Sequence, residues 1–169
     1  MTTTLFTNAH IATGEPGSTA ASTLPLQDIL VTDGVFTAFG PGLAQQYEAQ
    51  GGDLAAIEVV DLGGKLVCPP FCDTHLHLDY VFTARKPGAV NESGTLFEGI
   101  QRWSETKSDL TVDEIKQRAK IGIKKEMLHG VQLIRSHADV TDPNLTSLKA
   151  LLELKEELKD TVTLQIVSF

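Results

Sequence analysis

The feature that most constrains the fold is an alternation of apolar strands and amphipathic helices over residues 66–169. The pattern predicts a strand over 66–78, an irregular stretch over 80–94, helices over 95–106 and 111–129, a strand over 131–140, a helix over 145–158 and a strand over 161–169. Such alternation is typical of βαβ units around a parallel sheet. The second part of the chain is therefore predicted to be α/β.

The helix predicted after Thr111 has clear signals at both ends. Thr111 is the expected N-cap, and Glu114 three residues later completes a capping box. His129 lies in the last turn, and Gly130 follows as the glycine that commonly ends a helix. Trp103, in the helix before it, is expected to serve as a packing residue.

Residues 1–65 are predicted to form a separate, β-rich part. Two apolar runs, 29–31 and 35–39, meet across Asp33-Gly34, a pair that favours the positive φ angles of a tight hairpin turn. Further strands are expected at 4–11 and 57–62, a loop at 12–21, and a short helix or loose insert at 43–56. We therefore predict two domains, 1–65 and 66–169.

Charge and composition exclude several classes of protein. The 22 acidic and 14 basic residues give a net charge of −8, which repels nucleic-acid phosphates and anionic lipids. No stretch approaches the ~18 apolar residues of a membrane span, and residues 1–6 lack the basic start of a secretory signal. Two cysteines are too few for a disulfide framework. We expect no nucleic-acid or membrane partner and a cytoplasmic location.

His75 and His77 form the clearest candidate site. Residues i and i+2 of a strand point to the same face, so two imidazoles can converge on one divalent metal ion. Asp73 and Asp79 share this alternation and are candidates to orient the two rings. Histidine pairs of this spacing also occur without a metal, and a catalytic site usually has three protein ligands. The pair alone leaves both interpretations open.

Two further groups of polar residues have competing interpretations. Cys68 and Cys72 are more simply explained as small buried side chains than as thiolate ligands, because Cys72 is predicted to face away from the histidines. Arg135, His137 and Asp139 alternate along the second strand and predict either a lined cavity or a structural ion pair with a satisfied histidine. His137 is in addition a candidate to orient the metal ligands.

The sequence stops inside the strand predicted for 161–169. A parallel strand at a sheet edge, without a following helix, leaves apolar side chains and backbone groups uncovered. We expect the chain to be the N-terminal fragment of a longer protein.

Several segments resemble the amidohydrolase superfamily and, within it, cytosine deaminase of the bacterial type. They are residues 28–40, 60–67, 70–79, 91–100, 116–119, 135–140 and 164–169. The resemblance implies a small β-sandwich followed by the first part of a (β/α)8 TIM-type barrel, truncated after the third barrel strand. It also implies a homo-oligomer in the full-length form.

The resemblance implies roles for three residues. His75 and His77 would be two ligands of an iron or zinc ion, and Leu96 would line the pocket for the base. The other ligands and the acid/base glutamate would lie beyond Phe169, so no catalytic residue is expected within this chain. The implied reaction, a step of pyrimidine salvage, is attack of metal-activated water on C4 of cytosine, giving uracil and ammonia. The chain alone is expected to be inactive.

Two alternatives stay open on the sequence. The substrate could be another cyclic amidine, amide or aminated heterocycle, because most of the residues that would read it are expected outside this chain. The chain could also be a non-catalytic interaction module, whose open half-barrel buries its edge by association.

Overall fold

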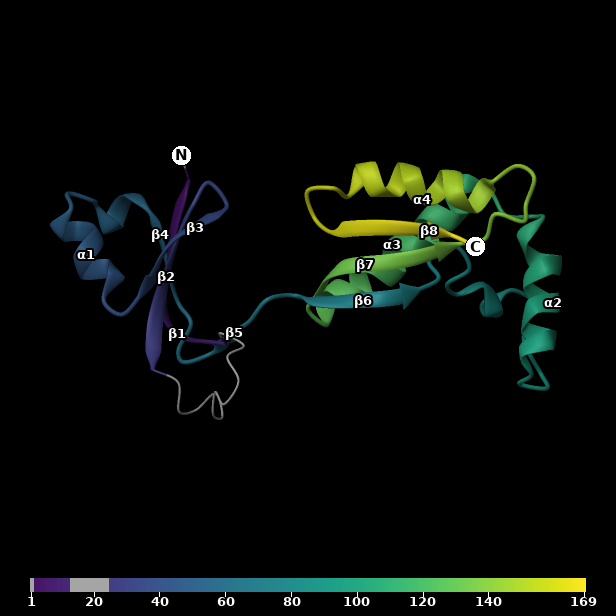
Figure 1. Ribbon diagram of the computed structural model, residues 1–169, viewed down its shortest axis with the longest axis horizontal. Helices are drawn as coiled ribbons and strands as arrows, with labels where there is room; N and C mark the ends of the chain where they lie inside the picture. The colour runs from purple at the N-terminus through teal and green to yellow at the C-terminus, as the bar shows by residue number, and fades with distance from the viewer. Residues whose placement is uncertain (1, 13–24) are drawn as a thin grey trace. The chain divides into compact units, whose positions relative to one another are not determined.

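The computed structural model describes residues 2–12 and 25–169, and the chain divides into two compact units between Pro69 and Pro70 (Figure 1). Most of the loop predicted for 12–21 lies outside the described residues. Among the described helices, none has the length and apolar character needed to cross a bilayer.

The first unit is built on one five-stranded sheet. Its strands are β1 (Thr3–Ile11), β2 (Leu26–Thr32), β3 (Val35–Gly40), β4 (Glu58–Asp61) and β5 (Leu66–Val67), and the order is β3-β2-β1-β4 with β5 also paired to β1. Helix α1 (Leu43–Ala49) and the short 3-10 helix η2 (Leu54–Ala56) connect β3 to β4. The predicted β2–β3 hairpin is confirmed, with φ angles of 50° at Asp33 and 78° at Gly34.

The single strand predicted over residues 66–78 is wrong. Leu66 and Val67 pair with β1 of the first unit, whereas β6 (Phe71–Leu76) belongs to a second sheet. Pro69 and Pro70 separate the two strands, since proline has no N–H to donate to a ladder. The boundary between the two compact units therefore lies after Pro69, whereas the sequence pattern predicted the domain boundary after residue 65. That the two units are a sandwich portion and a partial barrel stays a prediction.

The second unit is a parallel sheet with helices on one face. Strands β6, β7 (Val131–Ala138) and β8 (Thr163–Ser168) lie in that order, and the chain between them forms η3 (Thr83–Arg85), α2 (Leu96–Lys107), α3 (Val112–Leu128) and α4 (Thr146–Glu157). The predicted mixed α/β class is confirmed. The described residues form three parallel strands and do not close a barrel.

Helices α3 and α4 pack on the sheet through a shared apolar core. Ile134 and Ala138 of β7 are almost fully buried, as are Ala119 and Ile123 of α3 and Leu151 of α4. The Thr111 Oγ1 accepts the Glu114 N–H at 3.2 Å, so the predicted N-cap is confirmed. Helix α2 lies beyond the carboxyl ends of the strands, as Figure 1 shows.

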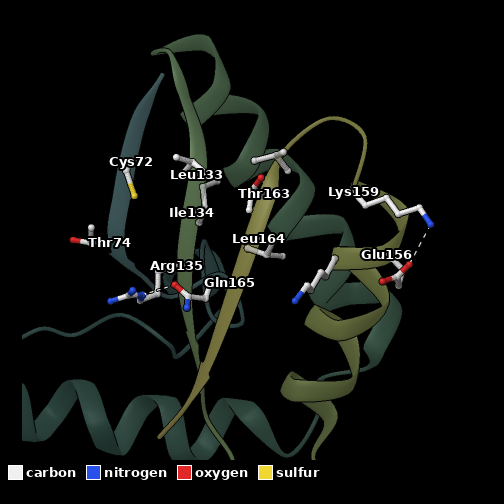
Figure 2. A pocket seen from close by; sticks show the side chains of 12 residues that line it. Cys72, Thr74, Leu133, Ile134, Arg135, Glu156, Lys159, Thr163, Leu164 and Gln165 are labelled. Atoms are coloured by element: carbon white, nitrogen blue, oxygen red, sulfur yellow. Dashed lines mark hydrogen bonds and ion pairs between the residues drawn. The ribbon is translucent and has the colours of Figure 1, made fainter. Parts of the chain in front are cut away.

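The other face of this sheet is open. Leu133 and Arg135 of β7 are exposed, and the Arg135 Nε donates to Gln165 Oε1 at 2.7 Å (Figure 2). A cavity of about 470 Å³ runs along this face and the edge of β8, and Cys72 and Thr74 are among its lining residues. Both cysteines are exposed, so the prediction that they are small buried side chains is wrong.

Two buried hydrogen bonds join the end of β6 to the end of β7. The Leu78 N–H donates to Ser136 Oγ at 3.0 Å, and the Asp139 N–H donates to Asp79 Oδ2 at 2.9 Å. Leu78, Ser136 and Asp79 are fully buried, so water cannot replace these partners. These bonds fix where the chain turns after β6.

We predict that Ser136→Ala destabilises the second unit by about 1–3 kcal/mol, because it leaves the buried Leu78 N–H without an acceptor. Urea unfolding followed by the fluorescence of Trp103, the single tryptophan of the chain, measures this unit selectively. Ser104→Ala, on the exposed side of α2, is the matched control and should change stability little. Equal stabilities of the two variants would contradict the role of Ser136.

Candidate metal centre

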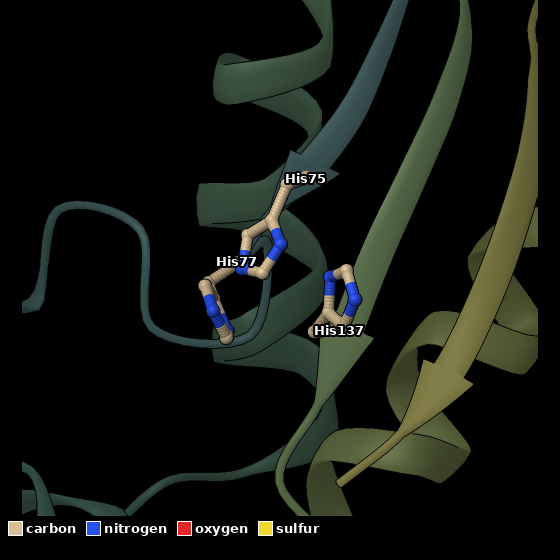
Figure 3. A group of neighbouring side chains, drawn as sticks. All are labelled: His75, His77 and His137. Atoms are coloured by element: carbon tan, nitrogen blue, oxygen red, sulfur yellow. The ribbon is translucent and has the colours of Figure 1, made fainter.

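Three imidazoles converge at the carboxyl end of the second sheet (Figure 3). His75 lies on β6, His77 follows the end of that strand, and His137 lies near the end of β7. One ring nitrogen from each lies within 4.8 Å of the others. The ring centroids of His75 and His137 are 4.0 Å apart, and those of His75 and His77 are 5.3 Å apart. The group lies where parallel α/β sheets commonly carry their sites.

The two predicted ligands converge by a different backbone path from the one expected. Strand β6 ends at Leu76, so His77 lies outside the regular alternation. Asp73 pairs with Ile134 and Leu76 with Ser136, which places one extra residue in β6. This irregularity shifts the alternation of side chains. It explains why Cys72 is on the open face, like His75, although strand alternation predicted that they would point to opposite faces.

The cluster has the donor chemistry of a transition-metal site. The Nδ1 atoms of His77 and His137 are buried and have no hydrogen-bond partner among the described residues. Burial lowers the pKa of His77, and repulsion from His137 and His75 lowers it further. A lowered pKa favours the neutral imidazole, which is the form that binds a metal.

The spacing of the ring nitrogens also fits one ion. Two imidazole nitrogens bound to one tetrahedral zinc ion at about 2.1 Å are about 3.4 Å apart. The ring nitrogens of the three histidines lie within 4.8 Å of one another, so each pair would approach by at most about 1.4 Å on binding an ion. Side-chain rotations of this size would place His75, His77 and His137 around an ion.

Asp73 and Asp79 contact backbone rather than imidazole. Asp73 Oδ1 accepts the His75 N–H at 2.9 Å, and Asp79 accepts the N–H groups of Asp139 and Tyr80. Burial raises the pKa of Asp79 to about 6, despite the N–H groups that donate to its carboxylate. Among the described residues no hydrogen bond joins either carboxylate to a ring of the cluster, and their predicted role in orienting the rings stays untested.

The three polar residues predicted on the second strand lie in three different environments. Arg135 bonds Gln165 on the open face, and His137 joins the imidazole cluster. Asp139 pairs with Lys107 at 3.0 Å instead of with Arg135. The buried Nδ1 of His137 has no hydrogen-bond partner among the described residues.

Sequence patterns missed an aromatic neighbour of the cluster. The Tyr80 ring stacks on His77 with a centroid separation of 4.7 Å, and the Trp103 ring lies 4.8 Å from Tyr80. Trp103 was expected to pack, but its Nε1 also donates to Asp139 Oδ2 at 2.5 Å. No spacing links residue 103 to residue 139, so only the fold brings them together. Leu96, the predicted base-pocket residue, is the first residue of α2 and is 74% exposed.

Known proteins are similar to this chain over part of their length. A solved structure of 5-methylcytosine deaminase from Klebsiella pneumoniae, liganded with 5-fluorocytosine, is 38% identical with a TM-score of 0.78, over 98% of this chain and 36% of that one. N-isopropylammelide isopropyl amidohydrolase of Pseudomonas sp. (strain ADP) is 35% identical over 114 residues, 65% of this chain and 28% of that protein. Pterin deaminase of Rhizobium rhizogenes is 26% identical over 145 residues, 83% of this chain and 30% of that protein.

The chain thus spans about a third of the length of these relatives. The model of the Amidohydrolase family matches residues 58–156, which include β6, all three histidines of the cluster and most of the helices of the second unit. On this match, and on the likeness to the solved structure, the chain belongs to the amidohydrolase family.

Proposed function

We propose that this chain is the N-terminal part of a metal-dependent hydrolytic deaminase that converts cytosine to uracil and ammonia. The observation that carries the proposal is the convergence of His75, His77 and His137 at the carboxyl end of a parallel sheet. The relatives of the chain support the reaction class, since two of them are named as deaminases of nitrogen heterocycles. We propose this activity for a longer protein, because the chain spans only about a third of the length of its relatives.

In this proposal the residues of the chain have separate tasks. His75 and His77 hold a zinc or iron ion, and His137 supplies a third nitrogen on the side of β7. The ion, when bound, provides the Lewis acidity that makes water nucleophilic near neutral pH. Leu96, exposed at the start of α2, contributes an apolar contact for the flat face of the base.

A second substrate class deserves a direct comparison. The 35% identity to N-isopropylammelide isopropyl amidohydrolase supports an aminated heterocycle other than cytosine. Both candidates lose an amine from a ring carbon by hydrolysis and would use the same metal ligands. Ammonia release from cytosine and amine release from N-isopropylammelide, measured with one preparation of the extended protein, separates the two by their kcat/KM values.

We expect the purified chain to bind one Zn²⁺ per molecule at the imidazole cluster. Alanine in place of His75, His77 or His137 should each weaken binding at least about tenfold, because each removes one ligand nitrogen. Isothermal titration calorimetry measures the affinity. His129→Ala is the matched control, since His129 is exposed at the end of α3 and lies outside the cluster. Equal weakening by the control would contradict a specific site.

The isolated 169-residue chain should not deaminate cytosine, even with added Zn²⁺ or Fe²⁺. A catalytic metal site needs its full ligand set and a group that transfers protons, and the described residues offer only the imidazole cluster. A steady-state assay of ammonia release tests this expectation. Measurable turnover by the 169-residue chain would overturn the proposal that the catalytic set is completed by residues outside it.

In the extended protein, Leu96→Ala should raise the KM for cytosine about tenfold with a smaller change in kcat, because the removed atoms touch the base rather than the reacting carbon. The melting temperature should not change, since Leu96 is 74% exposed. Leu152→Ala makes the same substitution at an exposed position of α4 and should leave both constants unchanged. An unchanged KM in the Leu96 variant would contradict the proposed contact between this residue and the base.

A further inference from the structure

Helix α2 is tied to the imidazole cluster by a column of aromatic rings. His77 stacks on Tyr80 with an interplanar angle of 26°, and Tyr80 meets Trp103 of α2 at 48°. The centroid separations of 4.7 Å and 4.8 Å are those of contacting rings. Trp103 is therefore connected to His77 through one intervening ring.

The far end of the column is fixed by a buried carboxylate. Asp139 is 5% exposed, and its Oδ2 accepts the Trp103 Nε1–H at 2.5 Å and the Lys107 Nζ–H at 3.0 Å. Its Oδ1 accepts the N–H and the hydroxyl of Thr141. Burial alone would raise the pKa of Asp139, but these donors hold it at about 2. The group stays ionised and keeps both residues of α2 in place.

The near end of the column is fixed by the backbone. Asp79, between His77 and Tyr80 in sequence, accepts the Tyr80 N–H at 3.1 Å and the Asp139 N–H at 2.9 Å. The segment that carries the ring of Tyr80 is thus attached to the same residue that holds Trp103. Both ends of the column depend on Asp139.

Besides Tyr80, the ring of His77 contacts the rings of His75, His137 and Phe169, with centroid separations of 5.3, 5.5 and 5.1 Å. Its buried Nδ1 has no hydrogen-bond partner among the described residues, so no bond to that atom sets the rotation of the ring. The usual device in metal sites is such a hydrogen bond to the second nitrogen of the imidazole. Of the rings around His77, that of Tyr80 is the nearest and the most nearly parallel, with a centroid separation of 4.7 Å and an interplanar angle of 26°.

We propose that Tyr80 and Trp103 are positioning residues for His77, so that the position of α2 sets the geometry of the metal centre. The proposal rests on the proposed function only in taking His77 as a metal ligand. Because α2 begins at Leu96, a substrate that contacts that end of the helix would also change the position of the His77 imidazole. The column replaces the hydrogen bond that other metal sites use to orient a histidine.

The test is the imidazole NMR spectrum of the metal-free 169-residue chain, combined with Zn²⁺ titration. Trp103→Phe keeps an aromatic ring but loses the Nε1 donor to Asp139, and it does not touch His77 directly. We expect it to shift the His77 ring signals and to weaken Zn²⁺ binding about tenfold. The signals of His10 and His129, which lie outside the cluster, are the internal reference and should not move.

Three further variants keep the result interpretable. Tyr80→Phe retains the stacked ring and should preserve Zn²⁺ affinity, whereas Tyr80→Leu should lower it about tenfold. Phe97→Leu removes an aromatic ring that is 84% exposed on the same helix and should leave His77 unchanged. If Tyr80→Leu fails to fold, Trp103→Phe and Tyr80→Phe still decide the question.

The outcomes separate this proposal from the proposed function. Unchanged His77 signals in Trp103→Phe overturn the positioning role, whether or not Zn²⁺ binds. Shifted signals with wild-type Zn²⁺ affinity also overturn it, because the contact would then have no effect on the ligand. Shifted signals in a chain that binds no Zn²⁺ support the column and refute the metal centre.

Discussion

The candidate site depends on the buried bond between the Asp79 carboxylate and the Asp139 N–H, at 2.9 Å. It joins the chain that leaves β6 to the chain that leaves β7, and with Ser136 and Leu78 it fixes where His77 emerges. A buried carboxylate is costly, and burial raises the pKa of Asp79 to about 6. Its backbone donors offset part of that cost, because they satisfy the oxygens in a region that water does not reach.

The same geometry brings three imidazoles into a small volume, and this affects the ionisation of His77. Neighbouring positive charges would repel, and the pKa of His77 is lowered first by burial and then by this repulsion. The rings of His75 and His137 stack, with 4.0 Å between their centroids. Such a group has unused nitrogen lone pairs, which is the condition for binding a metal and a poor arrangement for a core that only needs to pack.

Local patterns were enough to predict what depends on local interactions. The hairpin at Asp33-Gly34, the N-cap at Thr111 and the strand–helix alternation follow from turn chemistry, capping and periodicity, and the structure confirms them. The His75-x-His77 spacing identified two members of the cluster, but for a reason that fails, because β6 is irregular and ends before His77. The exposed Cys72 shows the same limit: strand alternation assumes a regular ladder, and one extra residue reverses it.

What the sequence could not provide is the set of long-range contacts around the histidines. Trp103 and Asp139 lie on different elements, and their hydrogen bond exists only because α2 is placed at the carboxyl ends of the strands. Asp79 is a similar case, because no spacing in the sequence links it to the Asp139 N–H that its carboxylate accepts. Polar residues near the imidazole cluster thus divide into those whose ring nitrogens converge and those that join the elements around them. Asp79 and Asp139 belong to the second kind, since each forms hydrogen bonds between segments that are far apart in the sequence.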